Sequence, residues 1–211
     1  MTETIKHHPD SVTLIGFANG SLPSSLAAVV ATHVMMCKSC QRDIARLEAI
    51  GGALLPDGDA RAPALREPSP TASALLHAEE NASAPLMPAA AWRAFGLTPG
   101  HIPWRRLGIG VSHFRLPPGQ TGGDLRFLKI APGLAVPEHG HGGTELTLVL
   151  SGAFSDVTGT YGPGDVQDVD GDIEHQPKVT PDGECICIVA SEHPAQFKTM
   201  LGRISQLWTG M

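Results

Sequence analysis

The stretch GLAVPEHGHGGTELTLVLSG, residues 133–152, decides the fold of the C-terminal half of this chain. His139 and His141 are two residues apart, so on an extended strand both side chains project from the same face. Glu145 lies four residues further on, with the same parity unless the glycine pair at 142 and 143 adds a bulge. Two imidazoles and a carboxylate that share one face can reach a single metal ion.

A fourth ligand must come from another strand, and His175 is the candidate. It follows the turn YGPGD and the segment DVQDV, which would bring the chain back antiparallel to the two histidines. Three imidazoles and one carboxylate suit zinc, iron, manganese or nickel. Tetrahedral zinc bound by all four would have no position for a substrate, whereas six-coordinate iron or manganese would keep two open. Coordination number therefore separates a structural or sensory site from a catalytic one.

Segments of alternating pattern, punctuated by glycine, surround this stretch from about Trp104 onward. They predict an all-β C-terminal domain over residues 86–195, an antiparallel jelly-roll barrel. After Pro194, the tail has apolar residues at helical spacing, which predicts an amphipathic helix over residues 196–211 that packs on the barrel. The segments expected to form strands are GIGVSHFRL, DLRFLKI, TELTLVL, GAFSDV, GDVQDV and CICIVAS.

The N-terminal part of the chain predicts a small all-α domain of three helices. Capping residues, a proline at Pro23 in a first turn and terminal glycines mark the helix boundaries. An Ala-, Pro- and Ser-rich linker follows, so the helical domain with its linker is expected to cover residues 1–85. The first helix is expected from Asp10 to Gly20, the second from Ser21 towards Cys37, and the third from after Cys40 to Gly51 and Gly52.

A second set of ligand-type residues lies among these helices. His33, Cys37 and Cys40 form the pattern H-x3-C-x2-C, and positions i, i+4 and i+7 share one face of a helix. Zinc prefers thiolate and imidazole ligands, and a fourth could come from His8 or its neighbour His7. A redox Cys-x-x-Cys motif or two unconnected helical cysteines are the alternatives. Because Cys37 ends a helical pattern rather than opening a helix after a strand, zinc is favoured.

Composition and charge restrict the classes of partner that this chain could bind. The chain has 211 residues, 42% of them hydrophobic, and a formal net charge of -6, so it lacks the basic character of a protein that binds nucleic acid directly. It contains no apolar run of membrane-spanning length, and the start MTETIKHHPD does not resemble a signal peptide, which predicts a cytoplasmic protein.

Cys185 and Cys187 alternate in CICIVAS, so they share one strand face and are expected to be buried as small apolar residues.

The two sets together resemble known families. The spacing from Gly133 through His139, His141 and Glu145 to Gly152 is similar to the first cupin motif, and the segment from Pro163 and Gly164 to His175 resembles the second, although its spacing is longer. An N-terminal histidine followed by His-x3-Cys-x2-Cys between two helices resembles the zinc-binding anti-sigma family. With a cupin domain behind it, nearly the whole chain resembles the ChrR branch of that family.

The resemblance implies a function. The helical domain would bind and inhibit an extracytoplasmic-function sigma factor by occluding its DNA- and polymerase-contacting surfaces, and the cupin domain would be needed for release on oxidative signals such as singlet oxygen. It also implies two zinc sites, the first formed by His8, His33, Cys37 and Cys40 and the second by His139, His141, Glu145 and His175. The alternative hypothesis is a cupin metalloenzyme, a dioxygenase or isomerase acting on a small acid or thiol.

Overall fold

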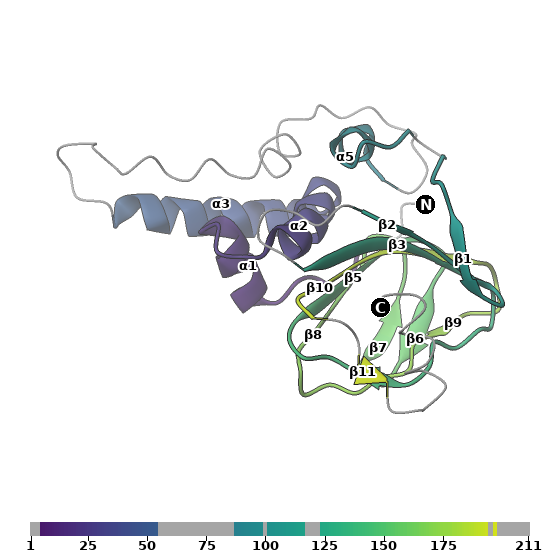
Figure 1. The fold of residues 1–211 in the computed structure, drawn as a ribbon. Coiled ribbons are helices and arrows are strands. Elements are labelled where there is room, and N and C mark those ends of the chain that lie inside the picture. Colours follow the sequence, from purple (N-terminus) through teal and green to yellow (C-terminus); the bar gives the residue numbers. More distant parts are fainter. Residues whose placement is uncertain (1–4, 55–86, 99–100, 117–122, 194–195, 198–211) are drawn as a thin grey trace.

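Helices from the N-terminal part of the chain lie against one face of a β-rich domain (Figure 1). The computed structural model describes residues 5–54, 87–98, 101–116, 123–193 and 196–197. None of the helices within these ranges is both long enough and apolar enough to span a membrane. The helices are α1 (Ser11–Ala18), α2 (Ser24–Met36), α3 (Lys38–Ala53) and α5 (Ala89–Ala94).

The start of α1 is as predicted, whereas that of α2 is not. Asp10 caps α1 by accepting a 2.6 Å hydrogen bond from the Thr13 amide. The predicted cap of the second helix, Ser21, still belongs to the turn that ends α1, because its amide donates to the Gly16 carbonyl. Helix α2 begins three residues later, after Pro23, and has no side-chain cap. The proline, with its φ of -51°, sets the entry into the helix instead.

The chain bends at Cys37, which corrects two predictions. Helix α2 ends at Met36 and α3 begins at Lys38, so Cys37 is an extended residue between them with φ -112° and ψ 105°. His33, Cys37 and Cys40 therefore do not share one face of a continuous helix. The third helix also starts before Cys40 and not after it, so that this cysteine lies in the first turn of α3.

The β-rich domain consists of two facing sheets and one short pair of strands. The predicted alternating segments all contribute strands. The large sheet has the antiparallel order β1 (Arg105–Gly108), β2 (Val111–Arg115), β3 (Asp124–Ile130), β10 (Cys185–Ser191), β5 (Glu145–Ser151), β8 (Val166–Val169). The small sheet has the order β7 (Gly159–Tyr161), β6 (Phe154–Asp156), β9 (Lys178–Val179), and β11 (Gln196–Phe197) pairs with β4 (His139–Gly140).

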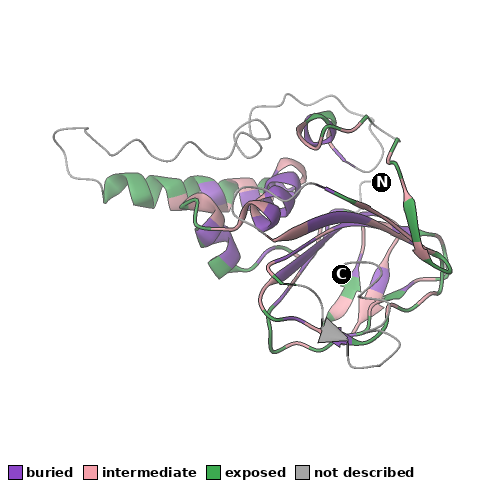
Figure 2. Ribbon diagram, in the orientation of Figure 1, coloured by how far each residue is buried: buried purple, intermediate pink, exposed green. Residues whose placement is uncertain are grey.

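The two faces of the large sheet pack against different parts of the protein. One face packs against α2, whose residues Leu26, Val29 and Val30 are at most 1% exposed. The other face turns towards the small sheet, where Ile130 and Val149 pack with side chains of β6, β7 and β9. The helices and the large sheet share one hydrophobic core (Figure 2). Burying one such aliphatic side chain contributes about 1.5–3 kcal/mol to stability.

The C-terminal tail departs from the prediction at its first two residues. Gln196 and Phe197 form β11, which pairs antiparallel with β4. Strand β4 pairs with this segment on one side and bridges to His175 on the other, so the predicted helix over 196–211 does not begin at Gln196. Residues 198–211, the rest of that prediction, lie outside the described residues.

Candidate metal centres

The first centre brings together the four predicted residues His8, His33, Cys37 and Cys40. His8 Nδ1 lies 3.4 Å from His33 Nε2, 3.4 Å from Cys37 Sγ and 3.5 Å from Cys40 Sγ. His33 Nε2 lies 3.3 Å from Cys40 Sγ. Four ligand atoms from three parts of the chain, the N-terminal segment, α2 and the α2–α3 junction, therefore surround one point.

These separations match the edges of a tetrahedron around zinc. Bond lengths of about 2.0–2.1 Å to nitrogen and about 2.3 Å to sulfur place two nitrogens roughly 3.4 Å apart, and a nitrogen and a sulfur roughly 3.6 Å apart. Burial drives the two innermost groups into uncharged forms. It lowers the pKa of His33 to about 4, and burial together with the neighbouring Cys37 raises the pKa of Cys40 to about 12. A cation at the centre would stabilise the thiolate and so offset the free-energy cost of burying its charge.

His8, and not its neighbour His7, faces the first centre. The ring of His7 lies instead against Tyr161, with 4.5 Å between ring centroids. His33 Nδ1 donates to the Gly164 carbonyl at 2.9 Å, so its Nε2 is left as the lone-pair nitrogen that faces the cysteines.

The second centre lies at the inner face of the large sheet and brings together His139, His141, Glu145 and His175. All four side chains are buried. His141 Nε2 lies 3.0 Å from His175 Nε2, and Glu145 Oε2 lies 3.4 Å from His141 Nδ1. His139 and His175 form an antiparallel bridge, as the return of the chain through YGPGD predicts.

Hydrogen bonds orient two of the three imidazoles. His139 Nδ1 donates to the Pro137 carbonyl at 2.9 Å, and His175 Nδ1 donates to Asp156 Oδ2 at 2.7 Å. In each ring the proton is then on Nδ1, and Nε2 carries the lone pair. Asp156 is the group that the sequence did not reveal, because it lies 19 residues before His175 and only the packing of β6 brings them together.

Burial disfavours the charged forms of His139, His141 and Glu145. It lowers the pKa of His139 to about 4 and, aided by the other two imidazoles, that of His141 to about 3. It raises the pKa of Glu145 to about 8, against the opposing effect of the Arg126 guanidinium. Neutral imidazoles and a carboxylate that a cation would keep ionised are a donor set suited to a divalent metal.

The ligands of the second centre do not share one continuous strand, contrary to the prediction. His139 belongs to the short strand β4, whereas Glu145 begins β5, and the chain bends at Gly142 and Gly143 between them. His141 lies in this connection. The bend turns the histidines towards Glu145, and the fourth ligand arrives from the segment after β8.

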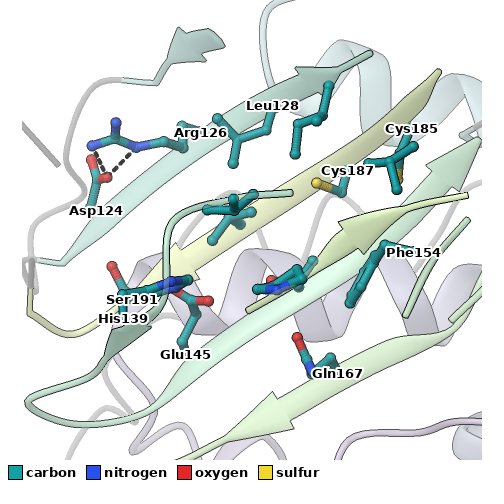
Figure 3. A pocket seen from close by; sticks show the side chains of 16 residues that line it. Asp124, Arg126, Leu128, His139, Glu145, Phe154, Gln167, Cys185, Cys187 and Ser191 are labelled. Carbon is teal, nitrogen blue, oxygen red and sulfur yellow. Dashed lines mark hydrogen bonds and ion pairs between the residues drawn. The ribbon is translucent and has the colours of Figure 1, made fainter. Parts of the chain in front are cut away.

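A cavity of about 90 Å³ adjoins the second centre between the two sheets. Figure 3 shows its polar end at His139, Glu145 and Ser191, with Arg126 paired to Asp124 nearby. Its other end is lined mainly by apolar side chains and by two unbridged thiols, those of Cys185 and Cys187, which share one face of β10 and are buried as predicted.

The chain was compared with known proteins. The family model described as the ChrR Cupin-like domain matches residues 93–195. The anti-sigma-E factor ChrR of Cereibacter sphaeroides is 36% identical over 216 aligned residues, which cover 96% of this chain and 97% of that protein. The chain belongs to the ChrR family of anti-sigma factors. This ChrR family member has an N-terminal helical region followed by a cupin-like β-rich domain, which confirms the predicted order of a helical and a β-rich part.

Solved structures also resemble this chain, to different degrees. The crystal structure of Rhodobacter sphaeroides SigE in complex with the anti-sigma ChrR contains a chain 36% identical to this one, with a TM-score of 0.71, covering 89% of this chain and all of that one. A cupin-like protein of unknown function from Ralstonia eutropha JMP134, 21% identical with a TM-score of 0.40, covers 48% of this chain and 71% of that one and is too distant to support an argument.

Proposed function

We propose that this protein is a cytoplasmic anti-sigma factor that binds and inhibits an extracytoplasmic-function sigma factor. The observation that carries the proposal is the 36% identity to the anti-sigma-E factor ChrR, which extends over 96% of the chain. The matched crystal structure holds such a protein in complex with its sigma factor, SigE. Family membership favours this regulator over the cupin metalloenzyme.

Exposed apolar side chains on α1 and α3 support a docking surface for the sigma factor. Val12 and Ile15 on α1 are 73% and 47% exposed, although both belong to the apolar pattern of that helix. Ile50 in the last turns of α3 is 60% exposed and Leu54, just after its end, is 80% exposed. Figure 2 shows this end of α3 extending away from the β-rich domain. Apolar side chains that solvent reaches on two neighbouring helices are typical of a protein interface.

Zinc at the first centre would hold the sigma-binding helices in place. Its four ligands join the N-terminal segment, α2 and the α2–α3 junction. A structural zinc site of this kind contributes on the order of 10 kcal/mol to folding. Loss of the two thiolates is therefore expected to disorganise the surface that binds the sigma factor.

Zinc at the second centre would form the part of the protein that senses the oxidative signal. Four protein ligands complete a tetrahedral shell, so no coordination position is left for a substrate. We propose that an oxidative signal such as singlet oxygen alters this centre and shifts the complex towards release of the sigma factor. The cupin-like domain would then regulate the helices with which it shares a hydrophobic core.

Co-expression with a sigma factor encoded beside this chain, followed by affinity pull-down, tests the proposal. Wild type is expected to retain the sigma factor and the double variant Cys37→Ser, Cys40→Ser to lose it. Ile15→Asp should weaken capture of the sigma factor while leaving both metal centres intact. Ile109→Asp makes the same change at a 92% exposed position of the β-rich domain and should leave capture unchanged. Absence of a complex with wild type, or undiminished capture by the double variant, would contradict the proposal.

A further inference from the structure

The N-terminal segment that carries His8 runs along the outer edge of β8, the last strand of the large sheet. The Val166 amide donates to the His7 carbonyl at 3.1 Å, and the Asp10 amide donates to Asp168 Oδ2 at 3.0 Å. Backbone groups of an edge strand are open to pairing with another segment. The position of His8 is therefore set by the cupin-like domain as well as by the helices.

Asp165 makes the closest of these contacts. Its Oδ1 accepts hydrogen bonds from the amides of Lys6 at 2.6 Å and His7 at 3.0 Å, the two residues immediately before His8. Its Oδ2 accepts from the Gly162 amide at 2.9 Å, which fixes the carboxylate on its own loop. Asp165 is 5% exposed, and hydrogen bonds from amides to a buried carboxylate are among the stronger ones.

Gly164, the residue before it, holds a second ligand. Its carbonyl accepts from His33 Nδ1 at 2.9 Å, which directs His33 Nε2 towards the cysteines. The residue has φ +90°, and a Cβ there would lie 2.7 Å from Ile5 Cγ1. Only glycine lets the loop adopt this conformation and approach the N-terminal segment so closely.

We propose, on the basis of the metal binding proposed above, that the cupin-like domain completes the first metal centre from outside its ligand shell. Asp165 and the Gly164 carbonyl are positioning groups: Asp165 fixes the backbone that presents His8, and Gly164 fixes the ring of His33. Neither touches the metal position. The affinity of the first centre for metal therefore depends on a loop of the other domain, residues 162–165.

Cobalt(II) titration of the full chain tests this dependence, because the first centre alone contains thiolates and so alone gives a sulfur-to-cobalt charge-transfer absorption. Asp165→Ala is expected to weaken cobalt binding at the first centre by about ten- to a hundredfold, the usual effect of removing a group that orients a ligand. Sulfur-free cobalt binding at the second centre should persist and show that the barrel is folded. Asp172→Ala, which removes an exposed carboxylate in the loop after β8, should bind cobalt at the first centre as wild type does.

A second pair of variants leaves the cupin-like domain intact. Lys6→Pro deletes the amide that donates to Asp165 and should weaken the first centre, whereas Lys6→Ala removes the same side chain but keeps that amide and should not. Wild-type affinity in both Asp165→Ala and Lys6→Pro would overturn the positioning role while leaving the metal assignment intact. Absence of the thiolate absorption in wild type would instead overturn the metal assignment, and the positioning role with it.

Discussion

The two metal centres differ in how they are built. The second has its ligands and its orienting groups, the Pro137 carbonyl and Asp156, within one domain, and all of its ligands are buried. The first draws ligands from three separate parts of the helical region, includes the exposed His8 and is oriented by groups of the other domain. The second centre is therefore built and oriented within one domain, whereas the first takes its ligands from the helical region and its orienting contacts from the cupin-like domain.

Removal of the thiolates should give the largest effect and would show how much the first centre contributes to folding. The double variant Cys37→Ser, Cys40→Ser is expected to lose metal from the first centre and with it on the order of 10 kcal/mol of metal-dependent stability in the helical region. Circular dichroism at increasing temperature, with and without a chelator, measures this. Cys185→Ala removes a buried cysteine outside either ligand set and should keep both metals.

A chelator should remove metal from the two centres at different rates. Because His8 is exposed and its segment is held by hydrogen bonds at a sheet edge, the first centre is expected to release metal at least tenfold faster than the second. In the cobalt form, decay of the thiolate absorption relative to total cobalt loss gives both rates. Faster loss from the second centre would reverse the comparison.

Asp156→Asn should weaken the second centre far more than the first. Its carboxylate orients His175, so the affinity of that centre is expected to fall about tenfold to a hundredfold while the thiolate absorption is retained. Competition with a metal indicator measures the affinity. Asp170→Asn, an exposed acid in the loop after β8, is the matched control, and an equal loss in that variant would argue against the orienting role.

The smallest expected effect is communication between the centres. Strand β8 contacts both: Gln167 donates to Asp156 at 2.7 Å on the inner side, and Val166 donates to His7 on the outer side. His175→Ala should therefore lower the affinity of the first centre by roughly twofold to tenfold. Linkage requires that metal at either centre of the wild type change the affinity of the other centre by the same factor, and wild-type affinity of the first centre in His175→Ala would exclude such coupling.

The chemistry of both centres could be predicted from the sequence, but their geometry could not. Spacing alone identified three residues of each ligand set, because residue types that bind metal recur there at short intervals. His175 was inferred from the predicted return of the chain, and His8 from the family resemblance. The bend at Cys37 was not predictable from helical periodicity, since the neighbouring residues continue the pattern and the break is set by the packing of α2 and α3.

The orienting groups were missed for a different reason. Asp165 lies 158 residues from His7, and Asp156 lies 19 residues from His175, so neither pair has a spacing that a sequence motif could encode. Asp156 precedes an ordinary turn, in which its side chain also accepts from Thr158. Such residues acquire their roles only when the two sheets and the N-terminal segment come together.

The zinc content of the purified complex with the sigma factor tests the central claim most directly. Metal analysis of that complex is expected to give two zinc ions for each copy of this chain, one for each ligand set. Iron or manganese at the second centre, or a complex that forms with no metal at the first, would contradict the account of a two-zinc anti-sigma factor.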